Sequence, residues 1–151
     1  MLGGGQEGGY RSGTEGTPAI FGFAAACAAV SATFRQDSIR EKAMIDSLAE
    51  RLQAIDGVTV NGAHEAPHVL SIGIPGVPTQ NSLNILQDSG ICVSAGSACA
   101  KGHRSHVLSA MELPPEVIDG SFRVSVCKDT TQEELDLLVT IIKDQIVPRA
   151  R

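Results

Sequence analysis

The sequence predicts an α+β fold in which helices cover a small, mainly antiparallel sheet and a long helix precedes that sheet. Three observations predict it: an alanine-rich apolar stretch early in the chain, short alternating segments in the second half, and amphipathic segments between and after them. The 151 residues are enough for one domain with its own core. We expect a glycine-rich loop over residues 1–16, a long helix or helix pair over 17–57, and the small α+β domain over 58–151.

The long helix is expected to begin at Thr17, because Thr17-Pro18 combines a preferred N-cap residue with a proline in the first turn. The stretch over residues 18–34 is apolar nearly all round, so we expect it to be buried on most sides. The pattern then becomes amphipathic and ends at the turn Asp56-Gly57. Its apolar residues recur at spacings of three and four: Ile45, Leu48, Leu52 and Ile55.

Several short segments of the second half have the composition or alternation of strands. In the last of them Phe122 and the two valines at alternate positions after it face one way, which places Arg123 on the opposite face. A helix over 79–88 is expected between strands, and a final helix after a capping box of Thr130 and Glu133. The expected strands are residues 58–61, 68–74, 91–94 and 122–127.

Composition and charge disfavour several classes of partner. The net charge of −5 argues against nucleic acid, whose phosphates require a basic face. No apolar run approaches about 20 residues and no cationic start precedes an apolar stretch, so we expect neither a membrane span nor a signal peptide. The four cysteines lie far apart with no C-x-x-C pair, which indicates reduced thiols and a cytoplasmic protein.

The stretch SAGSACAKGHRSH, residues 94–106, places Cys99 among small residues and follows it with several cations. Small residues such as Gly96 and Ser97 let a backbone bend, and cations stabilise a thiolate relative to a thiol. The pattern indicates a presented, reactive sulfur, while a structural cysteine beside a solvated basic turn fits the spacing equally well. The cations are Lys101, His103, Arg104 and His106.

The remaining cysteines and a metal site have simpler interpretations. Cys27 lies in the alanine-rich stretch, and Cys92 and Cys127 lie in predicted strands, so each is expected to be a small buried hydrophobic residue. Cys99 lies near two histidines, but their spacing in a loop is poor and no second cluster completes a tetrahedral set. We expect no metal.

The glycine-rich loop and Arg123 each have two interpretations. The loop could hold a phosphate, because glycine N–H groups, the Thr14 hydroxyl and the Arg11 guanidinium lie just before a helix N-terminus. It lacks the G-K-[ST] of a Walker loop, and an ordinary linker is the alternative. Arg123 either faces water or reaches into a cleft to bind a carboxylate.

Taken together and in order, these motifs resemble the C-terminal part of a group I cysteine desulfurase, a pyridoxal phosphate (PLP) enzyme of the class V aminotransferase family. GGGQE and YRSGTEGTP resemble the loop after the cofactor lysine, APHVLSIGIPGV the first strand of the small domain, and SAGSACA the catalytic-cysteine loop. SHVLSAM resembles the helix that follows, and FRVSVCKDTTQEELDLLV the substrate-arginine strand with its closing helix. The resemblance covers nearly the whole chain.

The resemblance implies the C-terminal small domain of a fold-type I PLP enzyme, with residues 1–16 facing the cofactor. Cys99 would attack the sulfur of L-cysteine and become a persulfide, with release of L-alanine, and Arg123 would hold the substrate carboxylate. Thr14 would hydrogen-bond the PLP phosphate of the neighbouring subunit in a homodimer, and an iron–sulfur scaffold or thiolation protein would accept the sulfur. The residues that would support the cysteine loop are Gly96, Ser97, Lys101, His103 and His106.

The chain departs from the family pattern in three places. Gly8 stands where the family's Q-E-R-G loop has arginine, and the loop after Cys99 is shorter than in the longest-loop members. The lysine that attaches PLP belongs to a histidine-lysine motif, and no lysine of this sequence lies in one, so we expect the chain alone to be inactive. Its lysines are Lys42, Lys101, Lys128 and Lys143.

Two other functions stay open from the sequence. A stand-alone persulfide carrier or interaction module would use Cys99 only to accept and pass on sulfur, and an inactive dimerisation remnant would need no reactive residue. The cofactor-facing loop with Thr14 and Arg11 disfavours the first. The joint presence of Cys99 and Arg123 disfavours the second.

Overall fold

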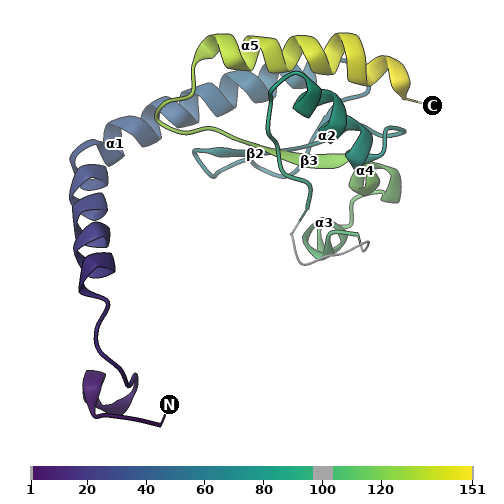
Figure 1. The fold of residues 1–151 in the computed structure, drawn as a ribbon. Helices are drawn as coiled ribbons and strands as arrows, with labels where there is room; N and C mark the ends of the chain where they lie inside the picture. Colours follow the sequence, from purple (N-terminus) through teal and green to yellow (C-terminus); the bar gives the residue numbers. More distant parts are fainter. Residues whose placement is uncertain (1, 97–103, 151) are drawn as a thin grey trace. The chain divides into compact units, whose positions relative to one another are not determined.

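The computed structural model describes residues 2–96 and 104–150, and the chain divides into two compact units, Met1–Arg35 and Gln36–Arg151. In the first unit a glycine-rich segment containing a short 3₁₀ turn, Gln6–Gly9, leads into helix α1 (Thr17–Gln53) (Figure 1). Helix α1 begins at Thr17, as the sequence predicts, and runs as one helix into the second unit.

The first half of α1 is exposed, so the prediction that it is buried on most sides is wrong. Phe21, Phe23 and Phe34 are 76%, 73% and 60% accessible. An apolar helix is buried only where another surface covers it, and the described residues do not cover this one.

The prediction that no stretch is long and apolar enough to span a membrane is also wrong. Judged by length and composition alone, α1 could cross a bilayer, and the apolar part that meets this test lies near the N-terminus. Helices that pack in the cores of soluble proteins pass the same test, so this property does not by itself place the chain in a membrane.

The second unit contains the predicted small antiparallel sheet, with the strand order β1-β2-β3. Strands β1 (Thr59–Val60), β2 (Val69–Gly73) and β3 (Ser121–Ser125) pair antiparallel. The segment 91–94 is not a full strand as predicted, because only Ser94 forms a bridge, to Arg123 in β3.

The predicted helices of the second unit are present, α4 is an additional helix that the sequence did not predict, and the start of α5 needs one correction. The capping box is formed by Thr131 and Glu134, one residue later than predicted: the Thr131 hydroxyl accepts from Glu134 N, and the Glu134 carboxylate accepts from Thr131 N. Consecutive threonines and glutamates give both pairs the required spacing. The helices are α2 (Thr79–Asp88), α3 (His106–Ala110), α4 (Pro115–Asp119) and α5 (Gln132–Ile141), with a π turn at Ile142–Ile146 and a 3₁₀ turn at Val147–Arg149.

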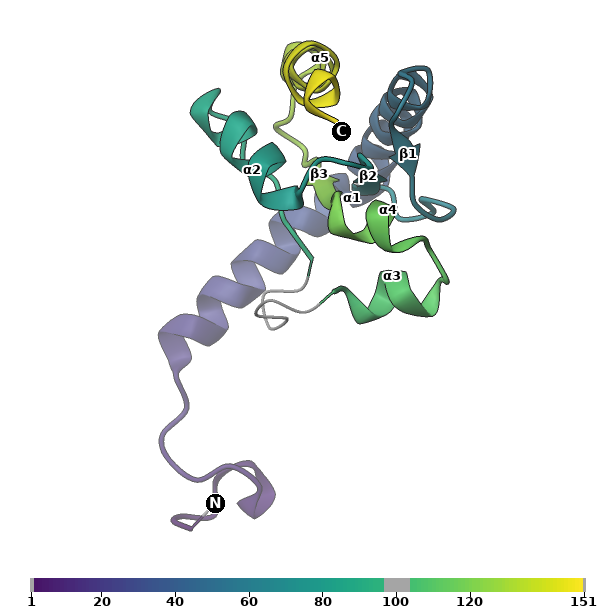
Figure 2. The same cartoon turned by 90° about the vertical axis from the view of Figure 1, so that its right-hand side faces the viewer.

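The core lies between one face of the sheet and the helices that cover it. In both views α5 and the second half of α1 lie on the same side of β2 and β3, whereas α3 lies on the other side (Figures 1 and 2). The sheet contributes alternate residues to the core, which leaves the other face of β2 and β3 for polar side chains. The fully buried side chains of the core include Ile45, Leu48, Leu52, Leu70, Ile72, Ile74, Leu86, Phe122, Ile142 and Ile146.

Arg40 connects α1 to the loop that follows β3. Its guanidinium donates to the backbone oxygens of Cys127 at 3.0 Å and Thr130 at 3.1 Å, and also to that of Lys128. These charge-assisted bonds pair carbonyls that neither the sheet nor α5 uses, and they fix the exit of β3 against the helical layer.

Candidate functional site

Arg123 lies in the middle of β3 on the face opposite the core, as predicted. Phe122 and Val124 on either side of it are 1% and 4% accessible, while Arg123 itself is exposed. It pairs with Ser71 of β2 on one side and with Ser94 on the other, where its N–H donates at 2.7 Å and its carbonyl accepts at 3.1 Å. The backbone of Arg123 therefore lies between β2 and Ser94, and its exposed side chain projects from the outer face of the sheet.

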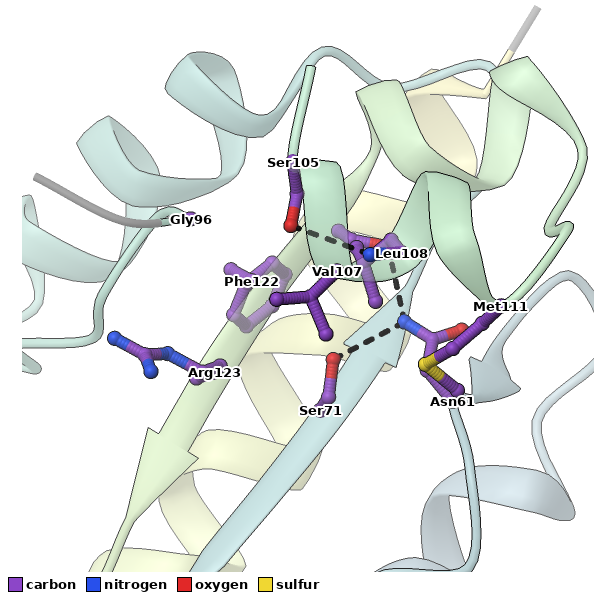
Figure 3. A pocket seen from close by; sticks show the side chains of 10 residues that line it. Asn61, Ser71, Gly96, Ser105, Val107, Leu108, Met111, Phe122 and Arg123 are labelled. Carbon is purple, nitrogen blue, oxygen red and sulfur yellow. Dashed lines mark hydrogen bonds between the residues drawn. The ribbon is translucent and has the colours of Figure 1, made fainter. Parts of the chain in front are cut away.

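A cavity of about 200 Å³ lies on this outer face, between the sheet and α3. Figure 3 shows Ser71 and Arg123 on the strands, Val107 of α3 near Phe122 and Ser71, and Met111 beside Asn61. The cavity combines an apolar wall with a guanidinium, which is an arrangement suited to a small ligand that carries a carboxylate.

A buried hydrogen-bond network forms one end of this cavity. Asn61 is 7% accessible, and its Nδ2 donates to Ser71 Oγ at 3.2 Å and to Ser121 Oγ at 3.0 Å (Figure 3). Ser121 Oγ in turn donates to the Val117 carbonyl at 2.6 Å. The network joins the residue after β1 to both longer strands and α4, so it fixes the register of the strands that present Arg123.

Described residues on both sides of the segment that carries Cys99 line this cavity. Gly96 and Ser105 both line it, and Ser105 is the N-cap of α3, where its hydroxyl accepts from Leu108 N at 3.4 Å. His106 is the first residue of α3 and is exposed. The predicted residues Ser97, Cys99, Lys101 and His103 lie outside the described residues.

Arg104 makes an interaction that the sequence did not predict. Its Nε and Nη2 each donate to a carboxylate oxygen of Asp119 at 2.7 Å, which is a bidentate pair. The hydrogen bond from Arg104 holds the pKa of Asp119 below its usual range, and the same pair raises the pKa of Arg104. The guanidinium of Arg104 is therefore engaged by a carboxylate.

Thr14 lies in the first unit, in the glycine-rich segment before α1, and is exposed. The segment is held by local hydrogen bonds: the Arg11 guanidinium donates to the carbonyls of Gly13 and Thr14 at 3.1 and 3.2 Å, and Gly13 N donates to Gln6 Oε1 at 3.2 Å. Arg11 thus orders its own loop, and the Thr14 side chain is accessible to a ligand.

The described residues do not make up a complete PLP site. Lys42 pairs with Asp46 on α1, and Lys128 lies 3.8 Å from Asp129 on the surface. No described lysine lines the cavity beside Arg123. A Schiff base to PLP requires such a lysine, so the described residues do not fit the attachment of the cofactor.

The prediction that the three other cysteines are buried is wrong, because Cys27, Cys92 and Cys127 are all exposed. Cys127 continues the outward alternation of β3, so the parity that placed Arg123 outside also places this thiol outside. Its pKa is lowered, first by the backbone N–H of Asp129 and then by the hydroxyl of Thr130, whose Oγ1 lies 3.6 Å from Sγ. Cys92 lines a second cavity, of about 320 Å³, which Thr130 also lines.

Comparisons with known proteins agree on one family. The sequence model of the family described as aminotransferase class V matches residues 4–138. A cysteine desulfurase of Nostoc sp. (strain PCC 7120) is 36% identical over 156 residues, and a cysteine desulfurase IscS of Tolumonas auensis is 37% identical over 150. These alignments cover 100% and 97% of this chain but 39% and 37% of the relatives.

A solved structure shares the fold. The NifS-like protein of Rickettsia africae superposes with a TM-score of 0.82 at 29% identity, over 95% of this chain and 38% of that chain. The chain thus spans less than two fifths of the length of these relatives.

Proposed function

Because the chain belongs to the class V aminotransferase family, we propose that it is the C-terminal part of a cysteine desulfurase that receives the sulfur of L-cysteine on Cys99. The predicted family and fold class are both confirmed. The proposal concerns the activity of the complete protein, its substrate and the roles of single residues.

The observation that carries the proposal is that the chain segment leading to Cys99 is bridged to the strand residue Arg123. Arg123 stands on the outer face of β3 beside the cavity, and the bridge from Arg123 to Ser94 lies five residues before Cys99 in the sequence. A carboxylate held by Arg123 would place an amino-acid substrate next to the segment that carries the nucleophile.

The proposed reaction on this chain is a sulfur transfer. The Cys99 thiolate attacks the substrate sulfur, an S–S bond forms, and the Cβ–S bond of the substrate breaks. The electron pair of that bond stays with the carbon, which takes a proton to become alanine, and Cys99 retains the sulfur as a persulfide. PLP, bound in the complete enzyme, supplies the electron sink that this bond cleavage requires.

The accepting partner follows from the same chemistry. A persulfide transfers its outer sulfur to another thiolate, so the proposed partner is a protein with an acceptor thiol, of the iron–sulfur scaffold or thiolation class. We place this reaction in the cytoplasm, where acceptor thiols are kept reduced.

A homodimer is part of the proposal, with Thr14 serving the PLP phosphate of the neighbouring subunit. The exposed aromatic residues of the first half of α1 support association, because single helices rarely expose such surface in water. Light scattering on the purified chain is expected to show a dimer. A monomer at all concentrations would contradict the association.

The experiment that tests the function mixes the purified chain with PLP and L-cysteine and follows the absorbance of PLP together with sulfide release. PLP and L-cysteine condense to a thiazolidine without protein, so a mixture without the chain is the control. Relative to this control we expect no further change in PLP absorbance and no turnover, because the described residues provide no lysine beside Arg123. Turnover that is lost in Cys99→Ala would show that a lysine of this chain attaches the cofactor, and the proposal of a C-terminal part without cofactor machinery would be wrong.

A further inference from the structure

The chain on either side of residues 97–103 is attached to the same region of the second unit. On the entering side, Ser94 exchanges two backbone hydrogen bonds with Arg123. On the returning side, Arg104 forms its two bonds with Asp119, the last residue of α4, two positions before β3 begins.

The Asp119 anchor is itself held in place. Thr79 Oγ1 at the start of α2 donates to the Asp119 carbonyl at 2.8 Å and to the Ser121 carbonyl at 2.9 Å. The next residue, Gly120, has no room for a side chain, since an added Cβ would lie 2.2 Å from the Ile74 carbonyl oxygen. The Ile74 N–H also donates to the Gly120 carbonyl at 3.1 Å, so the carboxylate projects from a turn that is bonded to α2 and to the residue after β2.

The Arg104–Asp119 pair is better suited to orientation than to stability. Two parallel N–H···O bonds fix the direction of a guanidinium, whereas a single contact fixes only its distance. The two side chains are 53% and 50% accessible, and exposed pairs contribute little to folding. A change at this pair should therefore alter the local path of the chain and leave the fold intact.

We propose that Arg104 and Asp119 are positioning residues for Cys99: their pair fixes the point at which the chain that follows Cys99 rejoins the small domain. The inference rests on the proposed function of Cys99. The sequence grouped Arg104 with the cations after Cys99, and the structure adds that its guanidinium pairs with Asp119.

The test compares Arg104→Gln, Asp119→Asn and the exchanged pair R104D/D119R in the full chain. The rate at which iodoacetamide alkylates Cys99 is measured by site-resolved mass spectrometry, with Cys92 and Cys127 as references in the same molecule. We expect both single variants to raise the Cys99 rate about two- to fivefold, the range that loss of a surface ion pair supports. The exchanged pair should restore the wild-type rate, and the rates at the two reference cysteines and the thermal midpoint should not change.

Opposite effects would overturn the proposal. If Arg104→Gln slows Cys99 while Asp119→Asn, which releases the guanidinium, accelerates it, Arg104 acts as a cation on the thiolate. Unchanged rates in both single variants would show that the pair has no role. Failure of the proposed function gives a different result, namely a wild-type Cys99 that reacts no faster than Cys92.

Discussion

Replacing Asn61 by alanine is expected to destabilise the second unit by about 2 kcal/mol. The change removes the bonds from Asn61 Nδ2 to Ser71 Oγ at 3.2 Å and Ser121 Oγ at 3.0 Å, and each neutral hydrogen bond contributes about 1 kcal/mol net. A buried group left wholly unpaired would add about 1–3 kcal/mol, but Ser121 keeps its bond to the Val117 carbonyl. Ser71 is only half-buried, so water can replace its lost partner.

Urea denaturation and thermal unfolding followed by circular dichroism measure this loss. About 2 kcal/mol corresponds to a fall in Tm of about 4–8 °C for a domain of this size. The matched control is Asn84→Ala on the exposed side of α2, whose side chain bonds only Gln80 among the described contacts and which should stay within about 0.5 kcal/mol of wild type. Equal effects of the two variants would refute the reasoning that the buried network holds the strands around Arg123.

Three further substitutions test other parts of the structure. Gly120→Ala should destabilise by about 1–3 kcal/mol, because its Cβ would lie 2.2 Å from the rigid carbonyl oxygen of Ile74. Ser82→Ala should be neutral or stabilise by up to about 1 kcal/mol, since the hydroxyl is fully buried and has no hydrogen-bond partner among the described residues. Thr130→Val should raise the pKa of Cys127, because it removes one of the hydrogen bonds that lower that pKa, so the midpoint of Cys127 alkylation should move to higher pH.

Each of these three has a result that would contradict it. For Gly120→Ala it is a stability equal to that of Gly22→Ala, where an added Cβ meets nothing within 4 Å. A loss of more than about 1 kcal/mol in Ser82→Ala would show that the hydroxyl has a stabilising partner. A midpoint for Cys127 that is unchanged in Thr130→Val would show that the Thr130 hydroxyl does not lower the pKa of Cys127.

Alternation along the sequence predicted the parts of the site that depend on local geometry. The apolar residues at 122, 124 and 126 placed Arg123 on the outer face, and the structure confirms it. The same alternation would have placed Cys127 on the outer face. Its prediction as a buried residue relied instead on the fact that free cysteines are usually buried, and Cys127 is exposed. Parity within a strand is the stronger signal, because side-chain direction follows directly from backbone geometry.

Contacts between residues distant in sequence could not be predicted in this way. Arg104 meets Asp119 across 15 residues, and Asn61 meets Ser121 across 60. Each pairing depends on which elements the fold brings together, and the local pattern around Arg104 indicated only a basic turn. The exposed first half of α1 could not be predicted for a related reason. Composition shows that a helix is apolar, but it does not identify the surface that covers the helix.

The central claim is that this chain supplies the sulfur-accepting cysteine of a cysteine desulfurase. The most direct test replaces the matching C-terminal part of the Nostoc sp. relative with residues 1–151 of this chain, and measures sulfide release and the intact mass after reaction with L-cysteine. We predict turnover, with one added sulfur on Cys99, both lost in Cys99→Ala and retained in the control Cys92→Ala. A folded, PLP-loaded chimera that turns over equally well without Cys99 would contradict the claim.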